Sequence, residues 1–519
     1  MSSIVYLKNK SSGKVYAYLN ESVWNSTLKK CECKRKCLGH VDPITGDIVP
    51  NKGNKKDSSA AMVNSLGMSH FLKGVSDKCG LTAALETAFP TDWKLILSAA
   101  FYLIDTDSST LSRMTYWSKD NDCPYGKEVL LSDLSEMLMR ISDNDTISFF
   151  RGWRDTHDAE DFYLSHTSST SSFDMRTGDI LFNNLPIVTI TPKTSLSMLY
   201  THKGGIPITY SVWDKTPVNT GDLDREVKEK MWLDLTKITH VLDSEFCNDS
   251  NIDMLFKNNS RFILRAPSEF YFARDAIERV RDRILSSENL KVIGGEQLFV
   301  MSFLNYWKGK RCYTHIYYST KNAESEFTYL LGLIDDCYRE LETNLRVREH
   351  ERVYKEYFSV ADTDEGRKVT VNGDAIMSYN DVAGFFVLVS NSIRSPVTAM
   401  NIYHQKDMVQ REFEDLRNER DRASLKLYSD VGYHGRIFVQ FICLILKVQI
   451  KKRIKSNALL KEMGVQGIIQ EMKALKKVTI PGFDIPFYTK VNSTQAEIMK
   501  AFGMDPMELT STPELRPVG

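Results

Sequence analysis

Between residues 156 and 275 the chain alternates short apolar strands with a helical segment, and this alternation constrains the fold more than any other feature. Five stretches are rich in the β-branched and aromatic residues that favour strands: DFYLSHTSS, LPIVTIT, SLSMLYTHKGGIPITYSVW, THVLDSEF and RFILRAP. Gly204 and Gly205 predict a hairpin turn within the third. DLDREVKEKMWLDL predicts a helix ahead of the fourth. A mixed run of this kind is typical of a layered α/β core.

The remainder of the chain is organised around this core. The residues before it predict short strands followed by amphipathic helices such as LTAALETAF, KLILSAAFYLI and LSDLSEMLMRI. Those after it predict a charged helical stretch, a hairpin, a strand GFFVLVSN and two long helices. We therefore expect six regions: a β-rich N-terminal region (1–60), a helical region (61–155), the first part of the core (156–275), an insert with helices and β-strands (276–380), the second part of the core with C-terminal helices (381–475), and a tail (476–519).

Composition narrows the class of protein. Of the residues, 42% are hydrophobic and 26% are charged, which is typical of a folded chain rather than a disordered one. Lys plus Arg and Asp plus Glu number 67 each, so contact with nucleic acid would depend on local basic patches. The most apolar run, IFVQFICLIL at 437–446, is shorter than the roughly 20 residues that a membrane span needs. It predicts a buried helix, and no membrane partner is expected.

Two positions attract attention as candidates for chemistry. Asp243 ends an apolar strand and precedes a loop, where open α/β sheets present ligands; the alternative is that its side chain caps the following turn. The predicted helix 401–420 places Val409, Phe413 and Leu416 on an apolar stripe and a polar group on one flank. That group comprises Tyr403, Lys406, Gln410, Glu414 and Arg417. Either the flank faces a site or it is solvated.

Five stretches, in order along the chain, resemble bacterial DDE insertion-sequence transposases with a Tyr-Arg-Glu-Lys signature, the insertion-sequence-four-like group. They are CKRKCLGHVDPITGDIVPN, SHTSSTSS, HVLDSEFCNDSNI, YHQKDMVQREFEDLRN and GRIFVQFICLIL. The resemblance implies an RNase H-like mixed sheet core interrupted by a β-rich insert, in an α+β or α/β fold. It also implies three carboxylates holding two divalent ions, Mg²⁺ or Mn²⁺, which stabilise the attacking and leaving oxygens of a phosphodiester.

Carried over residue by residue, the resemblance places the family's first Asp on Ser165, its second on Asp243 and its Glu on Gln410. The signature Tyr, Arg and Lys fall on Tyr403, Lys406 and Arg417. Two of the three acidic positions are therefore neutral.

The acidic residues near Ser165 and Gln410 are poorly placed to replace the two missing carboxylates. Asp161 lies on the same strand face as Ser165 but about 13 Å away along the strand. Glu414 lies about 6 Å from Gln410 along the helix and is the one plausible substitute ligand. His166 is out of phase with Ser165 and is expected to pack on the opposite face.

Two basic clusters could contact DNA phosphates without the metal site: Lys34, Arg35 and Lys36, and Lys451, Lys452 and Arg453. The alternative is that they form solubilising faces. Cys31, Cys33, Cys37 and His40 are spaced more tightly than usual zinc motifs, and incidental reduced thiols are the favoured interpretation.

The sequence thus predicts a transposase-like protein that binds double-stranded DNA, at element ends by resemblance, with an eroded catalytic site. A homodimer on DNA is left open. The expected location is the bacterial cytoplasm, with association with the nucleoid when the protein is bound to DNA. One alternative is an active DDE transposase that uses two divalent metals. The other is an RNase H-like scaffold for protein interaction.

Overall fold

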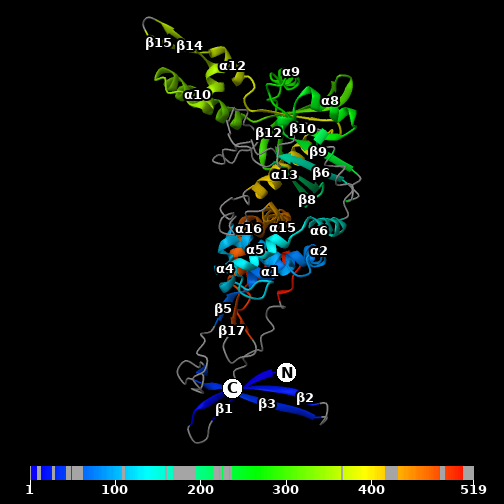
Figure 1. The fold of residues 1–519 in the computed structure, drawn as a ribbon, viewed down its shortest axis with the longest axis vertical. Coiled ribbons are helices and arrows are strands. Elements are labelled where there is room, and N and C mark those ends of the chain that lie inside the picture. Colours follow the sequence, from blue (N-terminus) through cyan, green and yellow to red (C-terminus); the bar gives the residue numbers. More distant parts are fainter. Residues whose placement is uncertain are drawn as a thin grey trace. The chain divides into compact units, whose positions relative to one another are not determined.

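The computed structural model describes residues 2–8, 13–25, 30–41, 48–49, 62–107, 111–157, 161–167, 195–213, 221–222, 225, 233, 237–363, 366–414, 430–479 and 486–506 (Figure 1). The chain divides into two compact units. The first comprises Met1–Val75, Arg113–Leu130 and Arg453–Gly519, and the second comprises Ser76–Ser112 and Leu131–Lys452. The six regions expected from the sequence stay a prediction.

The first unit contains two small sheets. One is an antiparallel sheet in the order β1-β2-β3-β4, formed by Ser2–Lys8, Val15–Asn25, Lys30–Val41 and Ile48–Val49. The other has the order β18-β17-β5, formed by Phe487–Tyr488, Lys476–Thr479 and Met62–Ser65. Its helices are α4 (Met114–Asp120), α16 (Ala458–Lys473) and α17 (Ser493–Ala501), together with most of α1 (Gly67–Lys78).

A large mixed sheet dominates the second unit (Figure 1). Its order is β11-β12-β13-β16-β10-β9-β6-β7-β8. In chain order the strands are β6 Asp161–Thr167, β7 Ser195–Thr201, β8 Pro207–Trp213, β9 Lys237–Leu242, β10 Arg261–Ala266, β11 Leu290–Ile293, β12 Glu296–Trp307, β13 Lys310–Tyr318 and β16 Phe385–Ser390. Only the pairs β6–β9 and β9–β10 are parallel; the other neighbours run antiparallel. Strands of the predicted insert therefore extend the central sheet.

Alternating side chains give this sheet two apolar faces. Leu242 and Leu264 belong to a cluster with helices α8 (Asp249–Lys257) and α9 (Tyr271–Val280). Val241 and Ile263, each one residue away, belong to a second cluster with helix α13 (Pro396–Glu414). Because both faces are covered, β16 is buried along its whole length. This layering brings α13 over the face that carries odd-numbered residues of β6 and β9.

The helices near the start of the second unit pack around α15 (Asp430–Ile454). They are α2 (Leu81–Ala88), α3 (Trp93–Thr106), α5 (Leu131–Arg140) and α6 (Asp143–Asp155), with the short η1 (Leu111–Arg113) at the boundary between the units. Phe438 of α15 contacts the rings of Phe89, Phe149 and Phe150. The indole of Trp153 on α6 donates a hydrogen bond of 2.7 Å to the carbonyl of Pro207 on β8. These helices are thus joined to the sheet.

The insert has its own small core. It contains α10 (Thr320–Glu342), α11 (Glu351–Tyr357), α12 (Gly373–Asn380) and a hairpin of β14 (Phe358–Thr363) and β15 (Gly366–Val371). Single turns η3 (Ser244–Phe246), η4 (Ser287–Asn289) and η5 (Arg348–His350) lie between longer elements. Leu330 and Ile334 of α10 pack with Val353 and Tyr357 of α11.

Several expectations can be compared with these elements. The mixed α/β class is confirmed, as are the strands at 161–167, 195–213 and 261–266. The run 437–446 is a buried helix as expected, and within the described residues no helix is long and apolar enough to cross a bilayer. The expected strand 185–191 lies outside the described residues, as does most of the expected helix 222–235.

Gly384 joins α12 to β16 and offers a test of this architecture. Its φ is +75°, and an added Cβ would lie 2.6 Å from both the Cβ of Ala323 and the carbonyl oxygen of Ser319. We expect Gly384→Ala to lower the free energy of unfolding by roughly 1–3 kcal/mol, because a side chain is strained at this φ and has no space. Urea denaturation measures the change.

Gly332→Ala is the matched control, because Gly332 lies inside α10 and an added Cβ would have no neighbour within 4 Å. It should raise stability by about 0.5–1 kcal/mol, since alanine favours a helix over glycine. Equal effects of the two substitutions would contradict the described turn at Gly384.

Candidate functional site

Asp243 lies at the carboxyl end of β9, where the apolar strand KITHVL gives way to η3. It occupies the N-cap position of η3, yet its side chain makes no capping hydrogen bond. The capping alternative considered for Asp243 is therefore wrong. Instead the carboxylate faces α13, with 22% of its side chain exposed.

Helix α13 begins where a proline and a serine favour a helix start. Pro396 is its first residue, and the hydroxyl of Ser395 accepts a hydrogen bond of 3.3 Å from the Thr398 N–H. Ala399, Met400 and Ile402 then face the sheet, together with Tyr403. Tyr403 and Lys406 are 2% and 1% exposed, so the solvated-flank alternative is wrong for these two residues. The expected apolar stripe at Val409, Phe413 and Leu416 lies outside the described side chains.

Tyr403 and Lys406 both donate to one oxygen of Asp243. The tyrosine hydroxyl and the lysine Nζ each lie 2.5 Å from Asp243 Oδ1. The two donors are three residues apart on the helix and therefore lie on the same face. The ammonium also contacts Asp407 Oδ1 at 3.2 Å. A single buried cation is thus shared by two carboxylates.

The charges explain the protonation states at this cluster. Burial alone would raise the pKa of Asp243, but the Lys406 ammonium, with the Tyr403 hydroxyl and the charge of Arg265, holds it below its usual range. Burial would lower the pKa of Lys406, yet Asp243, Tyr403 and Asp407 raise it well above the ordinary value. The pKa of Asp407 is raised, mainly by burial, despite Lys406. The lysine is therefore held as a cation between the two acids.

Strand β6 contributes no carboxylate beside Asp243. Ser165 pairs with Val241 in the parallel register, and Asp243 lies two residues further along β9 on the same face. Tyr163 and Ser165 alternate onto that face, and neither is acidic. The Ser165 hydroxyl is buried and donates to the Met198 carbonyl at 3.3 Å. Asp161, at the start of β6, pairs with Arg261 at 3.1 Å.

The remaining predicted ligands are only partly described. Gln410 and Glu414 belong to α13, but their side chains lie outside the described set, and Arg417 lies outside the described residues. Among the described residues, Asp243 is not in any group of three or more His, Cys, Asp or Glu placed to hold a metal ion. His166 is buried and its ring stacks on His240 and contacts Phe246, as expected for a packed residue.

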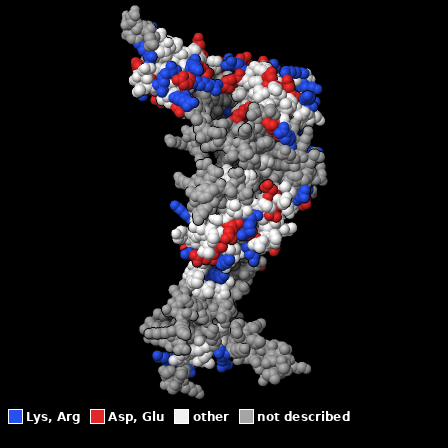
Figure 2. Space-filling model, in the orientation of Figure 1, with Lys and Arg blue, Asp and Glu red and all other residues white. Residues whose placement is uncertain are grey.

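The basic clusters are placed as follows. Arg35 lies exposed on β3, where the side chains of Lys34 and Lys36 are not described. Lys451, Lys452 and Arg453 form the C-terminal part of α15, and Lys452 and Arg453 are exposed. On the face drawn in Figure 2, Lys and Arg are interspersed with Asp and Glu over the described surface. Charge on that face does not by itself mark a nucleic-acid interface.

Sequence reasoning missed three residues of the cluster. Asp407 follows Lys406 directly, and its acidity could have drawn attention to it as a second partner for the lysine. Tyr200 on β7 is fully buried, and its hydroxyl has no hydrogen-bond partner among the described atoms. Arg265 is the last residue but one of β10, and its guanidinium carbon lies 5.1 Å from the centre of the Phe386 ring. Nothing in the sequence pattern singles out the last two.

No protein-family model matches the chain, and no curated protein matches it. Among solved structures, the chain has a weak likeness to the piggyBac transposase in its synaptic complex with hairpin DNA. The TM-score is 0.30 at 9% identity, over 87% of this chain and 80% of that chain. A likeness at this level establishes neither a shared fold nor a shared function.

Because of the ion pair between Lys406 and Asp243, we expect the free energy of unfolding to depend on pH in a specific way. Replacing Lys406 by Met leaves the partly buried Asp243 carboxylate without its cation, so we expect the free energy of unfolding at neutral pH to fall by about 3 kcal/mol. In the natural protein the lowered pKa of Asp243 stabilises the fold above the ordinary aspartate pKa, and this contribution is lost as the pH falls. In the variant burial raises that pKa, so protonation relieves the penalty. The difference in unfolding free energy between the natural protein and the variant should therefore become smaller as the pH falls towards about 4, as measured by urea denaturation.

Lys447→Met is a matched control. Its side chain is 8% exposed, and its ammonium lies 3.0 Å from Asp107, whose side chain is 65% exposed and stays hydrated when the lysine is removed. We expect a smaller loss with little dependence on pH. Similar pH profiles for the two variants would contradict the described pairing of Asp243.

Proposed function

We propose that this protein is a transposase-like DNA-binding protein with an RNase H-like core, in which the metal-dependent cleavage site is eroded. The sequence resemblance supplies the family, and the sheet and the Asp243 cluster support it. The observation that carries the proposal is the Lys406 ammonium, held between Asp243 and Asp407 with Tyr403 on the same carboxylate.

The strand order supports the RNase H-like part of the proposal. From one edge inward it is β8-β7-β6-β9-β10, that is 3-2-1-4-5 in chain order. The first three strands are antiparallel, and β9 and β10 run parallel to β6. This is the arrangement expected of an RNase H-like sheet, in which ligands bind beyond the carboxyl ends of the parallel strands. Asp243 is at such an end.

The Tyr403 and Lys406 contacts support the assignment of α13 to the signature helix. The resemblance gives these residues the places of the signature Tyr and Arg, and both contact Asp243, the counterpart of the second Asp. Tyr403 and Lys406, the two signature positions on α13, thus contact Asp243 at the end of β9, which lies 160 and 163 residues earlier in the chain.

The charge arrangement supports erosion of the site. Two-metal catalysis requires several anionic oxygens around two cations. Here Ser165 and Gln410 are neutral, and a lysine ammonium already neutralises Asp243. A divalent ion at Asp243 would have to compete with that ammonium for the same oxygen. The cluster is therefore suited to hold α13 on the sheet, and DNA would be bound through phosphate contacts elsewhere.

Metal binding tests the eroded site. Ser165→Asp combined with Gln410→Glu should create Mn²⁺ binding that the natural protein lacks, because it restores two anionic ligands beside Asp243. Isothermal titration calorimetry of the full chain measures it. Ser165→Asn with Gln410 unchanged is the neutral control and should bind no Mn²⁺.

Two outcomes would overturn this part of the proposal. If the natural protein binds Mn²⁺ and Asp243→Asn abolishes the binding, the site is intact and the active transposase is the better interpretation. If the double variant binds no Mn²⁺ while remaining folded by circular dichroism, Ser165 and Gln410 do not occupy the acidic positions.

The salt dependence of binding tests the DNA partner. The logarithm of the association constant for double-stranded DNA should fall linearly with the logarithm of salt concentration, with a slope of about −0.9 per phosphate neutralised. Replacing Lys451, Lys452 and Arg453 by Gln should reduce that slope by up to about 3, since each side chain then releases no counterion. Fluorescence anisotropy with a labelled duplex measures both.

Arg279, Arg339 and Arg352 supply a control of equal charge, because each is half or more exposed and pairs with an acid one turn away. Their replacement by Gln should leave the slope unchanged. Absence of any binding by the natural protein at low salt would refute the DNA partner and leave the protein-interaction scaffold.

A further inference from the structure

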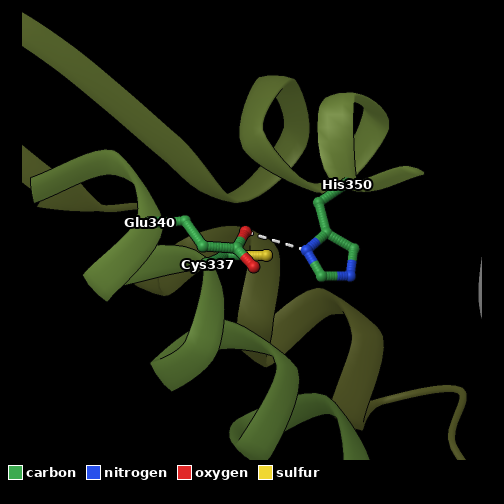
Figure 3. A group of neighbouring side chains, drawn as sticks. All are labelled: Cys337, Glu340 and His350. Carbon is green, nitrogen blue, oxygen red and sulfur yellow. Dashed lines mark hydrogen bonds and ion pairs between the residues drawn. The ribbon is translucent and has the colours of Figure 1, made fainter. Parts of the chain in front are cut away.

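Three metal-ligating side chains converge in the insert, away from the Asp243 cluster. Cys337 and Glu340 are three residues apart on the last turns of α10, and His350 ends η5, just before α11. The chain between them turns back over residues 343–347, so the end of α10 lies beside the start of α11. Figure 3 shows the three side chains directed towards one another.

The distances between the donor atoms of the three side chains allow them to bind one metal ion. One donor atom from each residue lies within 4.8 Å of the others, and this is the only such group of three found among the described residues. His350 Nδ1 lies 2.8 Å from Glu340 Oε2. Cys337 is fully buried, while Glu340 and His350 are 20% and 27% exposed. Solvent can therefore reach one side of the group.

We propose that Cys337, Glu340 and His350 bind a Zn²⁺ ion, with solvent in the fourth position. Thiolate, imidazole and carboxylate are the donors that zinc takes in tetrahedral sites, and three protein ligands with one open position is a recurrent arrangement. Magnesium and calcium prefer all-oxygen sites, so a thiol and an imidazole disfavour them.

A neighbouring tyrosine supports the carboxylate. The Tyr354 hydroxyl donates to Glu340 Oε2 and accepts a hydrogen bond of 2.9 Å from the Val347 N–H. Such outer partners fix the orientation of a ligand and commonly change metal affinity when removed. Here Tyr354 connects the carboxylate to the turn that the ion would close.

Zinc binding requires the Cys337 thiol to lose its proton, which burial opposes. Burial, together with Glu340 and Asp336, raises the pKa of this thiol to about 12. A coordinating cation deprotonates a thiol outright, so zinc binding would replace the S–H bond with a Zn–S bond and release the proton to solvent. The bound ion would then join α10 to α11 and stabilise the small core of the insert.

Cobalt substitution in the full chain tests the site. We expect the protein to bind Co²⁺ in a tetrahedral complex with a thiolate-to-cobalt charge-transfer band, and Zn²⁺ to displace it. Cys337→Ser should abolish the band and His350→Ala should weaken binding. Cys312→Ser is the matched control, because Cys312 is also a fully buried cysteine and lies outside the group. That variant should keep the spectrum.

Tyr354→Phe tests whether Tyr354 orients the Glu340 carboxylate without itself binding the metal ion. It should lower zinc affinity by about 10–100-fold, measured by competition with a chromogenic chelator, while keeping the charge-transfer band. Circular dichroism checks that each variant is folded.

Either of two results would overturn the proposal. One is the absence of a charge-transfer band in the natural protein. The other is a band that survives Cys337→Ser but is lost when Cys31, Cys33 and Cys37 are replaced by Ser, which would place the ion at the N-terminal cysteines.

Discussion

The contact between Lys406 and Asp243 joins the helix α13 to the end of β9, across 163 residues of sequence. It places a cation that is 1% exposed against a carboxylate that retains some access to solvent. A buried charge is tolerated only where opposite charges and hydrogen bonds replace its lost hydration. Asp243 and Asp407 supply that replacement, and the ammonium also lies 4.6 Å from the centre of the Tyr403 ring, so the position of α13 on the sheet depends on this cluster.

The same cluster limits the chemistry that the sheet can support. In a site with two metal ions, carboxylates face cations that exchange with solvent and substrate. At the end of β9 the cation is a covalently attached ammonium, and the described side chains of β6 on the same face are Tyr163 and Ser165, which carry no carboxylate. The arrangement stabilises the packing of helix α13 on the sheet, and this supports the proposal that the metal site is eroded.

The stability of the insert depends on a small apolar core of its own and not on the Asp243 cluster. Its apolar core is small, formed mainly by one face of α10 and the residues of α11. Small cores gain stability from additional cross-links such as metal ions. The convergence of Cys337, Glu340 and His350 at the turn between these helices puts the proposed zinc site where the chain reverses. A role for zinc in the insert would be independent of whether the Asp243 cluster is catalytic.

The sequence alone determined the element types that local patterns specify. Apolar spacing indicated α2, α3, α5 and α15, and runs of β-branched residues indicated β6, β10 and β16. Through a resemblance and not through periodicity, it also indicated Tyr403 and Lys406 as signature positions and Asp243 as the second acidic position. Rotation about the helix axis placed them on a polar flank, whereas the structure buries them because α13 packs with that side on the sheet.

Only the tertiary structure decided that Asp243 faces α13 instead of capping η3, that Asp407 shares the same lysine, and that Cys337, Glu340 and His350 meet. The first depends on a contact between segments 163 residues apart. The other two depend on how the packing of α13 and the turn between α10 and α11 orient side chains that are close in sequence, which no local pattern encodes.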